Sequence, residues 1–112
     1  VLLRYAEASN LATGSVNATA LKCLQDIQTR AGVSTLTTTT NSEEFDKAVF
    51  AERGYEFLAE YKRWFDLVRR EKVSEFKSKY YPSSVMKANS HYYFPIPSTQ
   101  IKLTGWTNNA GY

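Results

Sequence analysis

Residues 42–71 carry the longest helical pattern in this sequence, and that pattern decides which folds are open to the chain. Asn41 or Ser42 can cap its start by accepting hydrogen bonds from the first free backbone N–H groups. Acidic residues follow in the first turn and basic residues stand at the end, which suits the helix dipole at both ends. They are Glu43, Glu44 and Asp46, and then Arg69, Arg70 and Lys72. We therefore predict one long helix over residues 42–71.

This helix is expected to carry apolar side chains on two sides when its residues are projected at about 100° each. The first side holds Phe50, Phe57, Tyr61, Trp64, Phe65 and Val68. The second side holds Phe45, Val49, Glu52, Glu56, Ala59, Arg63 and Leu67. A helix with apolar residues on two sides is normally covered on both. Two short helices can cover one side, and we expect protein outside this sequence to cover the other.

Residues of opposite charge stand at helical contact spacing within this helix. The pairs are Arg53 with Glu56, Glu56 with Arg63, Glu60 with Arg63, and Asp66 with Arg70. Arginines that meet carboxylates between packed helices usually satisfy buried charges and fix the register of the helices. We therefore assign one group of residues to structural ion pairs and the core. The group is Glu52, Arg53, Glu56, Arg63, Trp64, Asp66 and Arg69.

Glu56 and Glu60 offer an alternative, because two carboxylates on neighbouring turns can serve as the acid and base of a hydrolase. Each acidic residue here, however, has a Lys or Arg nearby in the sequence. Such pairing lowers the pKa of a carboxylate, whereas a general acid needs a raised pKa. The structural interpretation is therefore favoured, and we expect no catalytic residue in this chain.

The N-terminal part of the sequence predicts an antiparallel pair of helices. The first helix runs from about Leu2 to Leu11 and ends near Gly14, because glycine suits the left-handed position that follows a helix. Asn17 can cap the second helix, whose apolar residues recur at helical spacing until Gly32 stops it. Two helices of this size joined by a short turn form a hairpin.

The remaining segments are less regular. The Thr-rich residues 33–41 are expected to form a surface loop, and residues 73–80 one or two further turns before a Tyr-Pro step ends them. Residues 83–91 are expected to be loop, and a single turn is expected at 98–101, after two prolines that exclude a helix. The predicted fold is therefore mainly α, with a helix pair at 1–32, a long helix at 42–71, and an irregular tail rich in proline and aromatic residues at 72–112.

Charge and composition exclude several classes of protein. The net charge is +3, but the four lysines of residues 73–112 are scattered and form no stripe that follows nucleic-acid phosphates. No apolar run is long enough to span a bilayer.

Cys23 is the only cysteine and stands at an apolar position of the second helix, so we expect a small buried side chain and no thiolate metal site. The chain starts at Val1 without an initiator Met, a signal peptide or a helix cap, and we expect it to be a piece of a longer protein.

Several segments together form a recognisable combination. Residues 2–8 read Leu-Leu-Arg-Tyr-Ala-Glu-Ala, and residues 28–32 read Gln-Thr-Arg-Ala-Gly. Residues 50–69 contain a Glu-Arg pair, a further Glu, and then Arg-Trp-x-Asp-Leu-x-Arg. Residues 93–101 contain Pro-Ile-Pro, and residues 108–112 read Asn-Asn-Ala-Gly-Tyr. In this order they resemble a helix pair, a long helix, a Pro-Ile-Pro segment and a closing Gln-Asn-Pro-Gly-Tyr at the C-terminal end of SusD/RagB-family proteins.

The sequence departs from the family pattern at a few positions. Gly54 replaces an Arg that is common after the Glu-Arg pair, and Tyr61 stands where Gly is usual. Asn108 and Ala110 replace the Gln and Pro of the closing motif. These departures concern local packing and the last turn of the tail.

The resemblance implies the C-terminal part of an outer-membrane lipoprotein on the extracellular face. Such proteins bind glycans or other nutrients and cover a SusC-like TonB-dependent transporter, and their tetratricopeptide-like helix pairs form a scaffold of the α-α superhelix type. The family binds its ligand without chemistry, so the resemblance implies no catalytic residue, metal or cofactor. Its lipidated N-terminal cysteine has no match here, because Cys23 lies within a helix pattern.

Aromatic side chains in irregular segments are the candidates for ligand contact, because sugar rings pack their apolar faces on aromatic rings. The candidates are Tyr80, Tyr81 and Trp106, with Tyr92 and Tyr93 as further aromatics of the tail. The alternative, that these side chains anchor the tail on helices, is favoured. His91 stands alone and is expected to be a surface or hydrogen-bonded histidine rather than a ligand of a metal.

Two other functions stay open. Helix pairs offer a concave surface, so the chain can belong to a helical-repeat module that recognises a protein. The hydrolase that uses Glu56 and Glu60 is the second.

Overall fold

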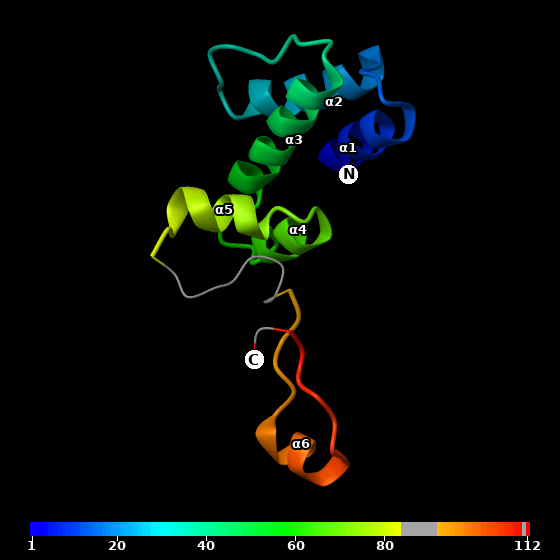
Figure 1. Cartoon of the computed structure of the whole chain (residues 1–112). Helices are drawn as coiled ribbons and strands as arrows, with labels where there is room; N and C mark the ends of the chain where they lie inside the picture. The colour runs from blue at the N-terminus through cyan, green and yellow to red at the C-terminus, as the bar shows by residue number, and fades with distance from the viewer. Residues whose placement is uncertain (84–91, 111) are drawn as a thin grey trace. The chain divides into compact units, whose positions relative to one another are not determined.

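The computed structural model describes residues 1–83, 92–110 and 112, and every regular element in this part of the chain is a helix. The helices are α1 (Leu2–Thr13), α2 (Ala18–Arg30), α3 (Ser42–Glu56), α4 (Arg63–Arg69), α5 (Val73–Tyr80) and α6 (Ser98–Thr104) (Figure 1). The mainly helical fold class is therefore confirmed. The predictions for His91 and for most of the loop at 83–91 fall outside the described residues.

The chain divides into two compact units, Val1–Tyr61 (unit 1) and Lys62–Tyr112 (unit 2), and each is described by itself. Unit 1 holds α1, α2 and α3, and unit 2 holds α4, α5 and α6. Within the described residues, none of the helices has the length and apolar character that crossing a membrane requires.

The first two helices form as predicted from their capping residues. Gly14 ends α1 with φ +65°, and its N–H bonds back to the carbonyl of Asn10 at 2.9 Å. A side chain is strained in this left-handed conformation, which glycine adopts freely. The side-chain oxygen of Asn17 accepts a hydrogen bond from the Ala20 N–H at 2.7 Å and so caps α2. At the far end of α2, Gly32 has φ +74° and ends the helix as expected.

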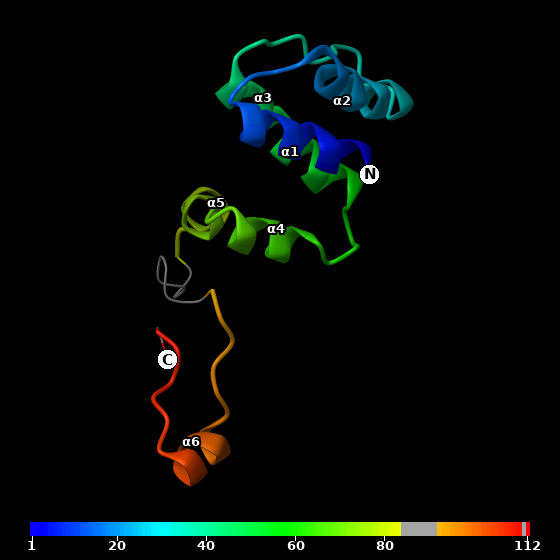
Figure 2. The ribbon, with the colours of Figure 1, turned by 90° about the vertical axis from the view of Figure 1, so that its right-hand side faces the viewer.

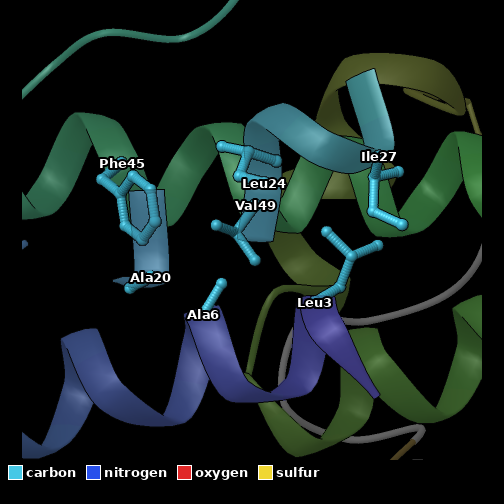
Figure 3. Packing of buried hydrophobic residues seen from close by; sticks show 7 residues of the cluster. All are labelled: Leu3, Ala6, Ala20, Leu24, Ile27, Phe45 and Val49. Atoms are coloured by element: carbon cyan, nitrogen blue, oxygen red, sulfur yellow. The ribbon is translucent and has the colours of Figure 1, made fainter. Parts of the chain in front are cut away.

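The core of unit 1 lies between its three helices. Seven buried side chains point toward one another from α1, α2 and α3 (Figure 3). They are Leu3, Ala6, Ala20, Leu24, Ile27, Phe45 and Val49. Cys23 is partly buried and packs against this cluster, close to the small buried hydrophobe that the sequence predicts.

The prediction of one helix over residues 42–71 is wrong, because the chain leaves the helical path after Glu56. Asn41 caps α3 as expected and accepts hydrogen bonds from the N–H groups of Glu43 and Glu44. Residues 57–62 then form turns in which Ala59 and Tyr61 have φ values of 65° and 57°. Neither residue can continue a right-handed helix in that conformation. A separate short helix, α4, begins at Arg63.

The break changes the faces that the sequence analysis assigned. Phe45 and Val49 lie in the core, but Tyr61 and Phe65 are exposed by 90% and 68%. A continuous helix would have placed Glu56 two turns before Arg63 on the same side. Glu56 and Arg63 do not belong to one helix, because Glu56 ends α3 and Arg63 begins α4.

In unit 2, α4 and α5 follow each other through a tight turn (Figure 2). Glu71 adopts φ 53°, and the Lys72 N–H donates to the carbonyl of Leu67 at 2.8 Å, which closes α4 in the manner of a Schellman motif. Leu67 and Val73 are buried. The turns predicted for residues 73–80 are present as α5, which ends before Tyr81.

Residues 92–110 form a loop with α6 at its tip, and the two arms that lead into and out of α6 run side by side (Figures 1 and 2). The Asn108 Oδ1 accepts a hydrogen bond from the Ile96 N–H at 2.8 Å, and the Asn109 Nδ2 donates to the Phe94 carbonyl at 2.6 Å. The segment 72–112 is thus less irregular than predicted, because it contains α5 and α6. The single turn expected at 98–101 extends to Thr104.

Candidate functional site

Polar side chains join the three helices of unit 1 at the edges of its apolar core. At one end, Asn10 of α1 and Ser42 of α3 make a reciprocal pair of hydrogen bonds. The Asn10 Nδ2 donates to the Ser42 carbonyl, and the Ser42 Oγ donates to the Asn10 Oδ1, both at 3.0 Å. Asn10 is 1% exposed, so these two bonds fix α1 against the start of α3 where water cannot compete.

A buried ion pair joins the same two helices further along. The Arg53 Nε of α3 lies 3.9 Å from the Glu7 Oε2 of α1, and both side chains are nearly inaccessible to solvent. The Arg53 guanidinium also lies over the Phe57 ring, with its Cζ 5.3 Å from the ring centroid. Buried charges are tolerated only when they are paired, so this contact fixes which residues of α1 and α3 face each other.

The third contact joins α2, α3 and the Thr-rich loop through Gln28. Its Nε2 donates to the Thr37 Oγ1 at 3.0 Å and lies 3.4 Å from the Glu52 Oε2. Its Oε1 accepts a hydrogen bond from the Thr37 N–H at 2.9 Å, and the Gln25 Nε2 donates to the Thr37 carbonyl at 2.8 Å. The segment predicted as a surface loop is thus a loop that is held against α2 by two glutamine side chains.

Glu56 pairs with Arg30 at the end of α2, rather than with the Arg63 that the sequence analysis chose. The hydrogen bond and then the charge of Glu56 raise the pKa of the Arg30 guanidinium above its ordinary value. The Arg30 side chain is 62% exposed, so this is a surface ion pair and not a buried one. Glu60, the other carboxylate of the hydrolase hypothesis, is exposed.

The predicted ion-pair residues of unit 2 contact charged and aromatic side chains within that unit. Asp66 is buried, and its Oδ1 accepts a hydrogen bond from the Arg69 Nη2 at 3.0 Å within α4. The Arg63 guanidinium lies over the Phe76 ring, with its Cζ 5.8 Å from the ring centroid. Trp64, expected in the core, is only half-buried.

The candidate ligand-contact residues of the described chain are open to solvent. Tyr80, Tyr81 and Trp106 are exposed by 54%, 60% and 62%. Tyr80 and Tyr81 share a ring neighbour, Phe76, at centroid distances of 4.7 Å and 6.1 Å. Tyr93 is also exposed, whereas Tyr92 is half-buried. The structure therefore brings two of the candidates together and leaves their rings accessible.

Sequence reasoning missed three of the residues that join the helices of unit 1, namely Glu7, Asn10 and Gln28. A signal for them was present, because each is a polar residue at helical spacing from buried apolar ones. Glu7 and Asn10 stand four and seven residues after Leu3, on the same face of α1. Polar residues at such positions are normally bonded to a partner on the facing helix.

The described residues contain no group of three or more His, Cys, Asp or Glu side chains that is arranged to hold a metal ion. The carboxylates of Glu7, Glu52 and Glu56 instead meet arginine or amide groups of other helices.

Comparisons with known proteins agree with this architecture. The model of the SusD family matches residues 1–112. The crystal structure of a SusD superfamily protein from Parabacteroides distasonis is 29% identical, with a TM-score of 0.80, and covers 99% of this chain and 25% of that chain. The structure of a SusD homolog from Bacteroides thetaiotaomicron is 24% identical, with a TM-score of 0.74 and the same coverage, and shows likeness of fold alone.

This chain spans about a quarter of the length of the two solved structures that it matches. None of the curated proteins matches it. The predicted tetratricopeptide-like helical fold is confirmed by the likeness to the Parabacteroides distasonis structure.

Proposed function

Because this chain belongs to the SusD family, we propose that it is the C-terminal scaffold part of an extracellular protein that binds glycans or other nutrients. The observation that carries the proposal is the family match over residues 1–112, together with the helical fold that the chain has in common with the Parabacteroides distasonis structure. In this proposal the protein passes its ligand to a SusC-like TonB-dependent transporter. It lies on the extracellular face of the outer membrane and is held there by a lipid anchor.

The interior of unit 1 supports a scaffold role. Its helices are joined by an apolar core and by polar contacts that include the Glu7–Arg53 and Gln28–Glu52 pairs. Contacts of this kind hold helices in a fixed register, and the Glu7 and Glu52 carboxylates that take part in them are buried between the helices. We therefore propose a binding protein and not an enzyme, with no cofactor.

The ligand contacts proposed for this chain are Tyr80, Tyr81 and Trp106. Their exposed rings offer the flat apolar surfaces on which sugar rings pack, and neighbouring polar groups can orient the hydroxyls. The alternative role for these rings is to anchor the segment on another part of a larger protein.

Calorimetric titration against a panel of oligosaccharides tests the binding proposal. We expect heat of binding with at least one glycan, and loss of that heat when Tyr80 and Tyr81 are both replaced by Ala. The absence of binding to every glycan and peptide in the panel would contradict the proposal.

Co-purification tests the partner. Capture of a TonB-dependent barrel from outer membranes supports delivery to a transporter. Capture of a soluble partner alone favours the other function considered above, a helical-repeat module that recognises a protein.

A further inference from the structure

The end of α5 carries an aromatic cluster with cationic groups lying on it. We use the name α5 aromatic cluster for Phe76, Tyr80 and Tyr81, whose rings meet at centroid distances of 4.7 Å and 6.1 Å around Phe76. The Arg63 Cζ lies 5.8 Å from the Phe76 ring centroid, and the Lys79 Nζ lies 5.1 Å from the Tyr80 ring centroid. Two aromatic rings are thus held beside two positive charges by contacts within unit 2.

The outer rings of this cluster are accessible, whereas its base is not. Phe76 is partly buried, but Tyr80 and Tyr81 keep 54% and 60% of their surface exposed. Lys79 lies over the Tyr80 ring, so the Tyr81 ring is the more open platform. Tyrosine rings have only two side-chain torsions, and rings that already pack on a neighbour lose little further freedom when a ligand stacks on them.

The charge around the cluster is positive. Residues 72–83 hold three lysines and one glutamate. Lys72 is bonded to Glu75 at 3.0 Å, so that this acid is already neutralised by its neighbour. Lys77 and Lys79 therefore add positive charge that is not offset within α5. A flat apolar platform beside such charges fits a ligand that has both an apolar ring face and a negative group.

On these grounds we infer that the α5 aromatic cluster binds acidic oligosaccharides, whose pyranose rings carry carboxylate groups. The C–H face of one ring packs on Tyr81, and its carboxylate is placed to accept a hydrogen bond from the Lys79 ammonium. The inference rests on the proposed function and makes it more specific, because it states the class of glycan. A neutral glycan or a polypeptide on the same surface are the other outcomes of the test.

The test compares two probes that differ in whether their carboxyl groups are charged or methyl-esterified. Hexagalacturonate and its fully methyl-esterified form have the same rings and length, but only the first carries carboxylates. We expect the chain to bind hexagalacturonate at least about tenfold more tightly than the ester. Added salt should weaken binding of the acid and leave binding of the ester nearly unchanged, because salt screens exposed charges.

Two variants separate the platform from the charge. Tyr81→Ala should weaken binding of both probes by about tenfold or more, since stacking serves both. Lys79→Gln should weaken binding of the acid only and remove most of its salt dependence. Lys102→Gln on α6 is the matched control, because it removes an exposed lysine of the same unit and should leave both affinities unchanged. Circular dichroism spectra that overlay the parent spectrum show that each variant keeps its fold.

Each outcome decides the inference. The inference is supported if the acid binds more tightly than the ester, if Tyr81→Ala weakens binding of both probes, and if Lys79→Gln weakens binding of the acid only. Equal binding of acid and ester, or binding that both variants leave intact, overturns the inference while glycan binding itself stands. Binding of neutral glycans but not of hexagalacturonate also overturns the inference and leaves glycan binding itself standing. If no oligosaccharide binds at all, both the inference and the proposed function fail.

Discussion

The two units of this chain place their large apolar side chains differently. Unit 1 buries Phe45, Leu24 and Val49 completely between its helices. In the described part of unit 2 only Leu67 and Val73 are buried hydrophobic residues, and α6 buries none of its side chains. Many of its other aromatic and apolar residues are exposed. They include Phe65, Tyr80, Tyr81, Tyr93, Phe94, Leu103 and Trp106.

This difference shows that similar apolar content serves two purposes in one chain. Burial stabilises a fold in proportion to the apolar area removed from water, so the apolar residues of unit 1 act on stability. Exposed aromatic side chains contribute little to stability and are available for contact with a ligand or another surface. Substitution of a buried apolar residue in unit 1 should therefore lower the free energy of unfolding. Substitution of an exposed apolar residue in unit 2 should leave it nearly unchanged.

The largest difference is expected between Phe45→Ala and Leu103→Ala. Phe45 is fully buried, and its truncation leaves a cavity among α1, α2 and α3, so we expect a loss of about 3–5 kcal/mol in the free energy of unfolding. Leu103 is 80% exposed, and its truncation should change that free energy by less than about 0.5 kcal/mol. Urea unfolding followed by circular dichroism measures both. Equal losses at the two positions would contradict the division into a buried and an exposed set.

The buried ion pair of unit 1 gives the next largest effect. Glu7→Gln removes the negative charge beside Arg53, which stays in a site that is closed to solvent. Breaking a buried pair from one side is costly, and we expect a loss of about 3 kcal/mol in the same unfolding measurement.

Glu43→Gln is the matched control for this prediction, because Glu43 is an exposed carboxylate in the first turn of α3. It should cost no more than a few tenths of a kcal/mol. A loss after Glu7→Gln that is no larger than the control would mean that Glu7 and Arg53 do not stabilise each other.

Most of the fold was predictable from local chemistry, and the part that was not has a physical cause. Gly14, Asn17 and Asn41 end or cap their helices as predicted, since these signals act within a few residues. The break after Glu56 was not predicted, because Leu, Ala, Glu and Lys are all good helix formers and no proline stands in residues 57–62. The left-handed turn there is set by context and not by propensity.

The resemblance nevertheless contained a signal for this break. Tyr61 stands where the family usually has glycine, and glycine at a fixed position often marks a left-handed conformation. The observed φ of 57° at Tyr61 fits that interpretation. The departure at this position therefore identifies a residue that holds a conformation more suited to glycine.

Tyr61→Gly should consequently stabilise the chain, in contrast to most substitutions. A left-handed conformation costs a residue with a side chain about 1–2 kcal/mol, and glycine loses about 0.5–1 kcal/mol more backbone entropy on folding. The net gain in the free energy of unfolding should be about 0.5–1 kcal/mol. Ala51→Gly, at an exposed position inside α3, is the control and should cost about 1 kcal/mol. Destabilisation by Tyr61→Gly would show that the tyrosine side chain makes contacts worth more than its strain.

The candidate site was predictable by residue type but not by pairing. Two charged residues of α3 meet opposite charges, but Arg53 pairs with Glu7 and Glu56 pairs with Arg30. Both partners lie on other helices, and spacing within one helix cannot identify them. Pairing between helices depends on how the helices pack, which is set by the apolar core and not by the charges themselves.

The smallest effect is expected for Glu56→Gln, and it separates the structural from the catalytic interpretation of this carboxylate. The partner of Glu56 is Arg30, whose side chain is 62% exposed, so water can replace the lost contact. We expect a urea midpoint that stays within the scatter of repeat measurements, unlike the shift after Glu7→Gln. If the parent chain released reducing sugar from an oligosaccharide and Glu56→Gln abolished that release with the fold intact, the hydrolase would replace the binding protein as the better account. An unchanged unfolding curve with no hydrolysis by either protein leaves Glu56 as a surface link between α2 and α3.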